Sequence, residues 1–233
     1  AQIFNGDGST AAPLTKTGAG VLAIEGLNTY TGETMVNSGA VAVNGSIAGS
    51  VTVASTAKLG GIGAIGGNVN VAGGATLGLE SSLGTLDVAG SLTLADNSSV
   101  SLQLNGLNPG DGAGLYGQVN TAGAVTIGQN VTLSLSLGFA PSGPGDTFYF
   151  ILNRGADSTG MFANLAEGAQ IDLGNGYIGT LTYQANWTGE AGTSSFTGGN
   201  DVAIAVPEPG TVVTLLGGFG ALLGLGRFRR RQS

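Results

Sequence analysis

The stretch SVTVASTAKLGGIGAIGGNVNVAGGATLGL, Ser50 to Leu79, contains one pattern twice: SVTVASTAKLGG begins at Ser50 and NVNVAGGATLGL begins at Asn68. In both copies apolar residues alternate with small polar ones, a period of two that is typical of a β-strand with one buried face. A third segment, TLDVAGSLTLADNSSVSL, begins at Thr85. A degenerate repeat of roughly 17 to 22 residues predicts a solenoid in which each repeat forms one coil.

Glycine, Asn and Asp separate the expected strands, as at Asn44-Gly45 and Gly73-Gly74. These residues readily adopt the left-handed backbone conformations that tight corners use. Stacked coils would pair equivalent strands in parallel and gather inward Val, Leu and Ile into one apolar column. We therefore expect an all-β fold, a right-handed parallel β-helix. A Greek-key sandwich remains the alternative, because alternation with turns about every 8 to 12 residues is also typical of it.

The sequence changes in character near Phe139, since nine of its 14 aromatic residues lie between Phe139 and Phe196. The open end of a solenoid exposes unpaired strand edges and apolar side chains, so it needs a bulky cover. We assign residues 1–145 to the coils and 146–205 to an aromatic-rich β cap, with an aromatic platform for sugars as the functional alternative. Before residue 207 only Met161 to Gln170 has even a short helical period.

Composition excludes several classes of function. Residues 1–205 contain 13 acidic residues but only Lys16, Lys58 and Arg154 as cations, so nucleic-acid phosphates would repel them. The sequence has no Cys and no His, which removes thiolate nucleophiles, His-based triads and zinc sites with N or S ligands. We expect no catalytic residues, no cofactor and no metal site.

Three local patterns compete with this expectation. Gly61, Gly63 and Gly66 fit G-x-G-x-x-G, but no βαβ unit surrounds them. The segment 198–201 (GGND) resembles a calcium-binding repeat, but one copy lacks the six to eight oxygen ligands that calcium requires. A polysaccharide lyase or hydrolase needs carboxylates about 5 to 10 Å apart. Adjacent coils would bring Glu80 and Asp87 near each other, although most such residues are solvated turn positions.

Residues Leu14 to Gly45, LTKTGAGVLAIEGLNTYTGETMVNSGAVAVNG, resemble the autotransporter-associated β-strand repeat. The resemblance is carried by the elements K-T-G-x-G-x-L, N-x-Y-T-G and T-x-V-x-x-G, which fall on Lys16, Thr17, Gly18, Gly20, Leu22, Asn28, Tyr30, Thr31, Gly32, Thr34, Val36 and Gly39. The segment 58–77 resembles the continuation of such passengers, and Gly199 to Val202 resembles their usual finish. The resemblance implies a right-handed parallel β-helix exported to the cell surface.

The C-terminal tail, residues 206–233, differs from the rest in charge and hydropathy. A sorting-type motif is followed by an uncharged apolar segment, residues 211–226, and then by a cluster of cations. The motif is Val206, Pro207, Glu208 and Pro209, and the cations are Arg227, Arg229, Arg230 and Arg231. This order resembles the PEP-CTERM sorting signal, with Gly210 where Ser or Ala is more usual.

The tail is expected to act at a membrane. As a helix, the segment 211–226 would be about 24 Å long, a marginal transmembrane span. The arginines would stay in the cytoplasm and stop translocation. The resemblance implies an exosortase that recognises the tail, whereas a plain linker before an anchor is the alternative.

Together these features predict an exported bacterial protein of the cell surface or extracellular matrix, structural or adhesin-like and not an enzyme. The expected partners are an exosortase-type processing enzyme, the inner membrane transiently, and exopolysaccharide or another copy of the chain, with no nucleic acid. The body would first lie in the periplasm, anchored through its C-terminus, and then reach the surface or matrix. A polysaccharide-active enzyme and a carbohydrate-binding module are the alternatives.

Overall fold

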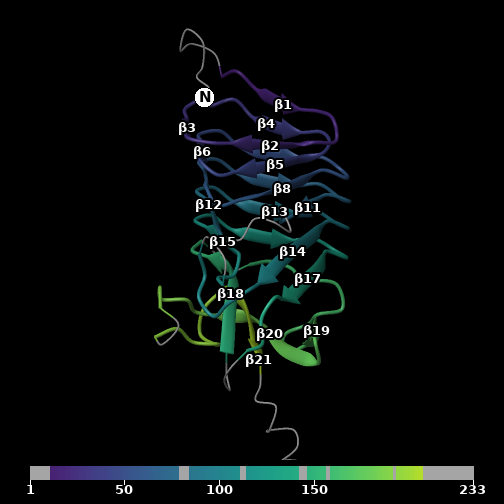
Figure 1. The fold of residues 1–233 in the computed structure, drawn as a ribbon, viewed down its shortest axis with the longest axis vertical. Helices are drawn as coiled ribbons and strands as arrows, with labels where there is room; N and C mark the ends of the chain where they lie inside the picture. Colours follow the sequence, from purple (N-terminus) through teal and green to yellow (C-terminus); the bar gives the residue numbers. More distant parts are fainter. Residues whose placement is uncertain are drawn as a thin grey trace, which may run out of the picture.

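A computed structural model describes residues 11–78, 84–110, 114–141, 146–155, 158–190 and 193–206. These residues form 21 strands and no helix, and most strands wind into a stack of coils (Figure 1). The short candidate helix at 161–170 is wrong. Asn164 and Gly168 adopt positive φ angles of 58° and 76°, which a right-handed helix excludes, and the segment makes two turns before a strand begins at Gln170.

Each coil contributes one strand to each of three sheets. The first sheet contains β1 (Leu14–Lys16), β4 (Thr34–Val36), β7 (Val51–Val53), β10 (Val69–Val71), β13 (Leu92–Leu94) and β16 (Val125–Ile127). The second contains β2 (Val21–Ile24), β5 (Ala40–Val43), β8 (Lys58–Gly61), β11 (Thr76–Leu77), β14 (Ser99–Leu104) and β17 (Thr132–Leu137). The third begins with β3 (Leu27–Asn28), β6 (Ser46–Ile47), β9 (Ala64–Ile65), β12 (Thr85–Val88), β15 (Gln118–Thr121) and β18 (Asp146–Asn153).

Successive coils pair in parallel and in register. Val51 lies beside Val69 and Val53 beside Val71, and the strands of the second and third sheets stack in the same way. A Greek-key sandwich is built from antiparallel pairs, so that alternative is wrong. The expected stack of parallel strands is confirmed, whereas the right-handed winding stays a prediction.

The inward side chains form one apolar column along the coil axis. In the first sheet Val53, Val71 and Leu94 occupy equivalent positions in three successive coils, and each is at most 1 % exposed. Ile47 and Ile65 stack in the same way in the third sheet. Burial of such side chains contributes about 1.5 to 3 kcal/mol each, which makes this column the main source of stability.

The coils lengthen toward the C-terminus. The equivalent positions that begin the strands of the first sheet are Leu14, Thr34, Val51, Val69, Leu92 and Val125, and the last two steps are the longest. The predicted step from the Ser50 segment to the Asn68 segment is confirmed, but the next predicted step is wrong. Thr85–Val88 stacks in the third sheet on β9, and Leu92–Leu94 is the segment that stacks on Val69–Val71. Both segments alternate equally well, so the period alone does not distinguish their registers.

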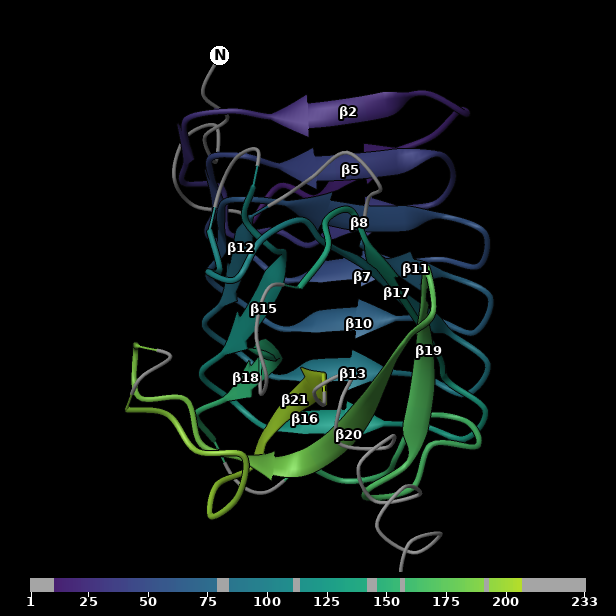
Figure 2. The ribbon, with the colours of Figure 1, turned by 60° about the horizontal axis from the view of Figure 1, so that its bottom comes forward.

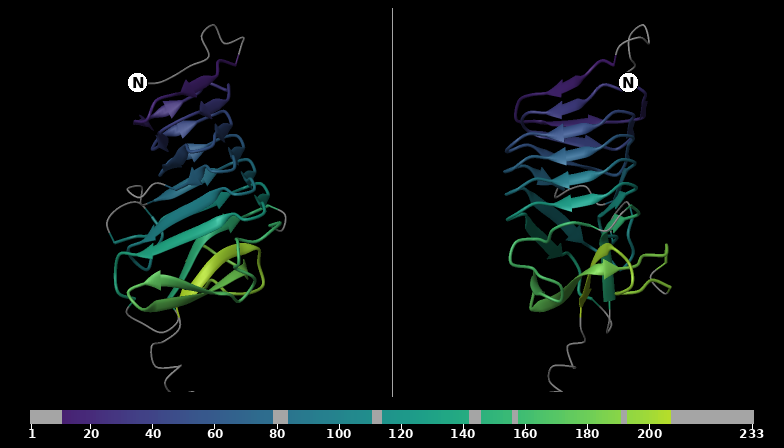
Figure 3. Two further views of the ribbon diagram at one scale, coloured as in Figure 1. Left: turned by 90° about the vertical axis from the view of Figure 1, so that its right-hand side faces the viewer. Right: turned by 180° about the vertical axis from the view of Figure 1, so that it is seen from behind.

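An antiparallel sheet completes the C-terminal end of the structure. β18 pairs in parallel with β15 on one edge and antiparallel with β21 (Asp201–Val206) on the other. β20 (Tyr177–Ala185) and β19 (Gln170–Gly174) follow in order. We call β18, β21, β20 and β19 the end sheet; it lies across the end of the coil farthest from β1 (Figures 2 and 3).

Aromatic side chains fill the space between the last coil and the end sheet. Phe148 and Phe150 of β18 are fully buried, and Tyr116 meets Phe148 edge-on with ring centroids 5.4 Å apart. Phe162 and Tyr183 stack at 6.2 Å in the same core. These rings are packed into the interior and present no flat platform to solvent.

Candidate functional site

The residues expected to direct sorting lie at the limit of the described chain. Val206 is the last residue of β21; it pairs with Asp146 and is 3 % exposed. Pro207, Glu208 and Pro209 lie outside the described residues. So do the apolar segment 211–226 and Arg227, Arg229, Arg230 and Arg231. Within the described ranges no helix is long and apolar enough to span a membrane.

Three polar residues of the repeat motif are buried in the first coils. The side-chain amide of Asn28 donates to the main-chain oxygens of Glu25, Gly26 and Ser46, at 3.1 to 3.2 Å. The Tyr30 hydroxyl shares a 2.6 Å hydrogen bond with the Thr34 hydroxyl, and both residues are fully buried. Burial raises the pKa of Tyr30 above its usual 10.0, so this phenol stays protonated at neutral pH.

The lysine and glycines of the motif fix the first corner. The Lys16 ammonium donates to the main-chain oxygens of Thr17, Gly18 and Ser38, and thereby joins the corners of two successive coils. Gly39 has a φ of 73°, and a Cβ there would overlap the Gly18 oxygen. Lys16 and Asn28 of the motif therefore hold neighbouring coils together.

The Gly199–Val202 segment ties the end sheet to the last coil. The Asn200 amide donates to the Gly155 oxygen at 3.1 Å. The Asp201 carboxylate accepts 2.7 Å hydrogen bonds from the main-chain N–H groups of Asn153 and Trp187. Burial raises the pKa of Asp201, and these two hydrogen bonds together with the charge of Arg154 act in the opposite direction. Asp201 therefore holds β18, β21 and the Trp187 segment together.

The other chemical candidates do not converge within the described chain. Gly61 and Gly63 approach the preceding coil, where a Cβ would overlap the Val43 oxygen and the Gly45 oxygen, respectively. Asp87 accepts a hydrogen bond from the Asn120 amide at 2.8 Å, while Glu80 lies outside the described residues. Among the residues placed by the structure, no three Asp or Glu side chains are grouped to hold a metal ion.

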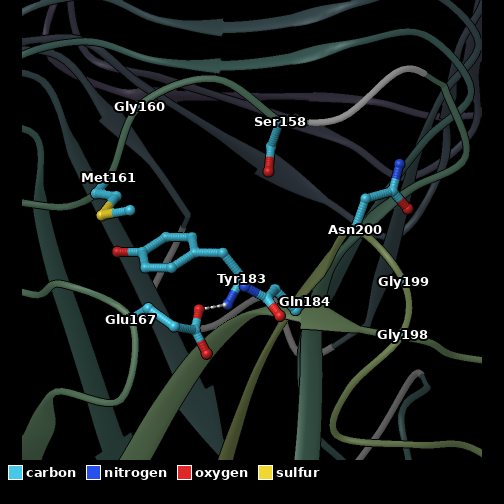
Figure 4. Close-up of a pocket in the computed structure, with 9 residues that line it drawn as sticks. All are labelled: Ser158, Gly160, Met161, Glu167, Tyr183, Gln184, Gly198, Gly199 and Asn200. Atoms are coloured by element: carbon cyan, nitrogen blue, oxygen red, sulfur yellow. Dashed lines mark hydrogen bonds between the residues drawn. The ribbon is translucent and has the colours of Figure 1, made fainter.

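A cavity of about 460 Å³ opens beside the end sheet. Its lining residues are Ser158, Gly160, Met161, Glu167, Tyr183, Gln184, Gly198, Gly199 and Asn200 (Figure 4). Glu167 accepts from the main-chain N–H of Tyr183 at 2.8 Å. The Tyr183 hydroxyl donates to the Leu165 oxygen and accepts from the Phe162 N–H, and burial raises its pKa to about 12. Both hydrogen bonds of the Tyr183 hydroxyl are therefore structural contacts within the core.

A second cavity of about 220 Å³ lies next to the first, since Asn200 lines both. Trp187 contributes one wall, and its ring packs against Tyr149 with centroids 4.9 Å apart. Arg154 contributes another, and its Nε donates to the Asn120 side chain at 2.9 Å. The lining of this cavity is mostly polar.

Sequence reasoning does not identify this second cavity. Trp187 and Phe196 belong to the aromatic run assigned to the cap, and Arg154 stands in the sequence as one of three scattered cations. The available signal is the polar composition around Trp187, with Asn186 before it and Asn200-Asp201 behind it in the sequence. Bringing Arg154 close to Trp187 and Asn200 requires the antiparallel pairing of β18 and β21, which the sequence does not reveal.

Comparison with known proteins identifies the N-terminal coils. Residues 14–43 match the Passenger-associated-transport-repeat family. Two proteins from Serratia marcescens, each described as an extracellular serine protease, are 45 % identical over 58 residues and 50 % identical over 48 residues. These matches cover 25 % and 21 % of this chain but only 6 % and 5 % of the proteases. The chain therefore contains a repeat of the autotransporter passenger type, a repeat of exported proteins that are on the cell surface or secreted.

Proposed function

We propose that the protein is a structural, adhesin-like component of the bacterial surface or extracellular matrix. The observation that carries this proposal is the use of the repeat motif: Lys16, Asn28 and Tyr30 are all engaged in contacts within and between coils. The distinctive polar residues of the motif thus stabilise a long scaffold. Such a scaffold can display its outward side chains to the surroundings along the whole stack of coils. The end sheet acts as the cap of that scaffold.

We further propose that the C-terminal tail, residues 206–233, directs sorting by an exosortase. The support is the order of the Val206–Pro209 motif, the apolar segment and the arginine cluster. Because Val206 is the last residue of β21, the motif would begin within the end sheet. The segment 211–226 would hold the C-terminus in the inner membrane until processing, with the arginines on the cytoplasmic side.

The test is fractionation of the full chain in a Gram-negative host with and without its exosortase. We expect release to the surface or matrix with the enzyme and inner-membrane retention without it. Replacing all four arginines by Gln should leave the protein secreted or misoriented without exosortase. Lys58→Gln, which removes one exposed cation of the coils, is the matched control. Unchanged membrane retention of the four-arginine variant would contradict the sorting role.

A polysaccharide-active enzyme is the competing function. The name of the two Serratia proteins concerns proteases and the matched part is a small fraction of them, so it assigns no reaction to this chain. Incubation of the purified chain with exopolysaccharide, followed by reducing-sugar and unsaturated-uronate assays, separates the two. Sustained sugar release would replace the structural role by an enzymatic one.

A further inference from the structure

We propose that Asn175 is a site of spontaneous deamidation, at which the folded protein converts an asparagine into aspartate and isoaspartate. Asn-Gly pairs are prone to this reaction, because glycine has no side chain to hinder the approach of its main-chain nitrogen to the asparagine side chain. The sequence contains four such pairs, which begin at Asn5, Asn44, Asn105 and Asn175. Asn5 lies outside the described residues, and the structure distinguishes the other three. The proposal is independent of the surface role proposed above.

Asn175 and Gly176 form the two-residue loop between β19 and β20, at the edge of the end sheet (Figure 2). Their φ angles of 54° and 81° are typical of a type I′ hairpin turn. Both residues are exposed, and a Cβ at Gly176 would meet nothing within 4 Å. Within the described chain, neither the Asn175 side chain nor the Gly176 N–H forms a hydrogen bond. Both reacting groups are therefore open to water and free of competing contacts.

The pair at Asn44 is held within the stack of coils. The Gly45 N–H donates to the Ile24 oxygen at 2.9 Å. The Asn44 amide donates to the Glu25 carboxylate at 2.8 Å. A Cβ at Gly45 would overlap main-chain atoms of Gly26 in the preceding coil. Reaction here requires two neighbouring coils to separate locally, which costs more free energy than opening an exposed loop.

The pair at Asn105 is covered by the chain that follows it. Gly106 is buried, and a Cβ there would overlap the Gly114 oxygen. The Asn105 main-chain N–H donates to the Leu115 oxygen at 3.2 Å. The segment that contains Gly114 and Leu115 must move away before the Gly106 nitrogen can turn toward the asparagine side chain. We therefore expect this pair to react more slowly than Asn175.

The hairpin can open at its loop while the coils stay intact. β19 is the outermost strand of the end sheet, and among the described strands it pairs only with β20. Opening of this edge strand at its tip gives the Gly176 nitrogen the freedom to approach Cγ of Asn175.

The reaction needs water and base but no other reactant. Hydroxide removes the proton of the Gly176 N–H, and the nitrogen forms a bond to Cγ of Asn175. The bond from Cγ to Nδ2 breaks, and Nδ2 takes up a proton from water and leaves as ammonia. Water then opens the cyclic imide at one of its two carbonyls, which restores the N–H and yields aspartate or isoaspartate. The rate should therefore rise with pH.

The isoaspartate product would loosen the edge of the end sheet. It adds one carbon atom to the main chain of a loop that joins the paired residues Gly174 and Tyr177. A two-residue turn determines the register of its strands, so a longer main chain disturbs that register. Leu173 of β19 is 2 % exposed, and a disturbed register would uncover this core side chain. The aspartate product keeps the main chain unchanged, and Asp tolerates the left-handed conformation.

Peptide mapping by mass spectrometry tests the order of reactivity. The full chain is incubated at mildly alkaline pH, once folded and once in concentrated urea. In the folded chain Asn175 should convert at least about tenfold faster than Asn44 and Asn105. In urea the three rates should lie within about threefold of one another, because the contacts that distinguish them are gone. Equal rates in the folded chain, or a faster reaction at Asn44 or Asn105, would overturn the assignment of the site.

Hydrogen exchange tests the structural consequence. The isoaspartate form is separated by anion exchange and compared with freshly purified Asn175→Asp, which has the same charge and an unaltered main chain. The amides of β19 should exchange at least about tenfold faster in the isoaspartate form than in the unmodified protein, and within about twofold of it in Asn175→Asp. Unchanged exchange in the isoaspartate form would overturn the loosening of the end sheet. Equally fast exchange in Asn175→Asp would show that charge, and not main-chain length, loosens it, which would also overturn that step.

Discussion

The side-chain amide of Gln118 donates a 2.6 Å hydrogen bond to the main-chain oxygen of Tyr149, where β18 leaves its regular register with β21. The main-chain N–H of Tyr149 is satisfied by a second side chain, the hydroxyl of Tyr116, at 3.2 Å. All three residues are buried. Two side chains thus replace the ladder bonds that are lost as the parallel coil becomes the antiparallel end sheet.

Replacing Gln118 by Ala should lower the free energy of unfolding by about 1 to 3 kcal/mol, because the buried Tyr149 oxygen loses its partner. Gln129→Ala, at an exposed corner position, should change it by less than about 0.5 kcal/mol. Urea denaturation of both variants measures the difference. Equal losses would show that the Gln118 bond contributes nothing beyond the side chain itself.

Thr56 lies at a corner with a left-handed backbone, where the next three coils have residues that adopt positive φ more readily. Its φ is 70°, and the residues at this corner in the next three coils are Gly74, Asn97 and Asn130, also with positive φ. A β-branched residue is disfavoured in the left-handed region by roughly 1 to 2 kcal/mol. Thr56→Asn should therefore stabilise the protein by about 1 kcal/mol.

The reverse exchange, Asn97→Thr, supplies the control for that corner. It should destabilise by a similar amount, about 1 kcal/mol, because it places a β-branched side chain at φ of 63°. Differential scanning calorimetry would record the two changes as shifts of opposite sign in Tm. Shifts of the same sign would mean that backbone strain is not what distinguishes the corner.

Asp201 gives the end sheet a pH dependence. Its pKa is raised above 3.8 in the folded state, first by burial. The protonated form is therefore favoured by folding, and the stability that it contributes is present below pH about 4 and is lost as pH rises through the folded pKa. Relative to Asp201→Asn, the unaltered protein should lose stability as pH increases from about 4.

Denaturation midpoints at constant ionic strength, from acid to neutral pH, measure this difference. Asp87→Asn, which removes an exposed carboxylate, corrects for the change in net charge. If the unaltered protein instead gains stability over Asp201→Asn as pH rises, then the two N–H donors and Arg154 outweigh burial, and the sign of the shift is wrong.

The coil is predictable from the sequence where the repeat is short. Val51 and Val69 follow one another at the length of a single coil, so their alternation and spacing together define the stack. The strand register of the later coils cannot be predicted from the sequence. Both β12 and β13 alternate, and residues inserted before β12 change the spacing. The corners can be recognised in the sequence, because the turns ASTA, AGGA and ADNS align. In each of them the third residue adopts the left-handed conformation, namely Thr56, Gly74 and Asn97.

The cavity beside Trp187 is less predictable than the coil. Arg154 is far in the sequence from Trp187 and Asn200, and the three line one cavity because β21 returns alongside β18. No period indicates such a return, since it depends on a bulge and on side chains, those of Tyr116 and Gln118, that satisfy it. The structural role of the segment Gly199–Val202 is likewise not predictable from the sequence, because it depends on where Asn153 lies in the last coil.

Cysteine cross-linking of adjacent coils probes the stacked parallel coil itself, and the chain has no Cys of its own to interfere. Thr52 and Asn70 are Cα partners in neighbouring parallel strands, about 4.8 Å apart, which a disulfide spans. Thr52→Cys with Asn70→Cys should oxidise to an intramolecular disulfide, detected by mass spectrometry. Thr52→Cys with Thr93→Cys, two strands apart, should stay reduced. A disulfide in the second pair and none in the first would contradict the stacked parallel coil.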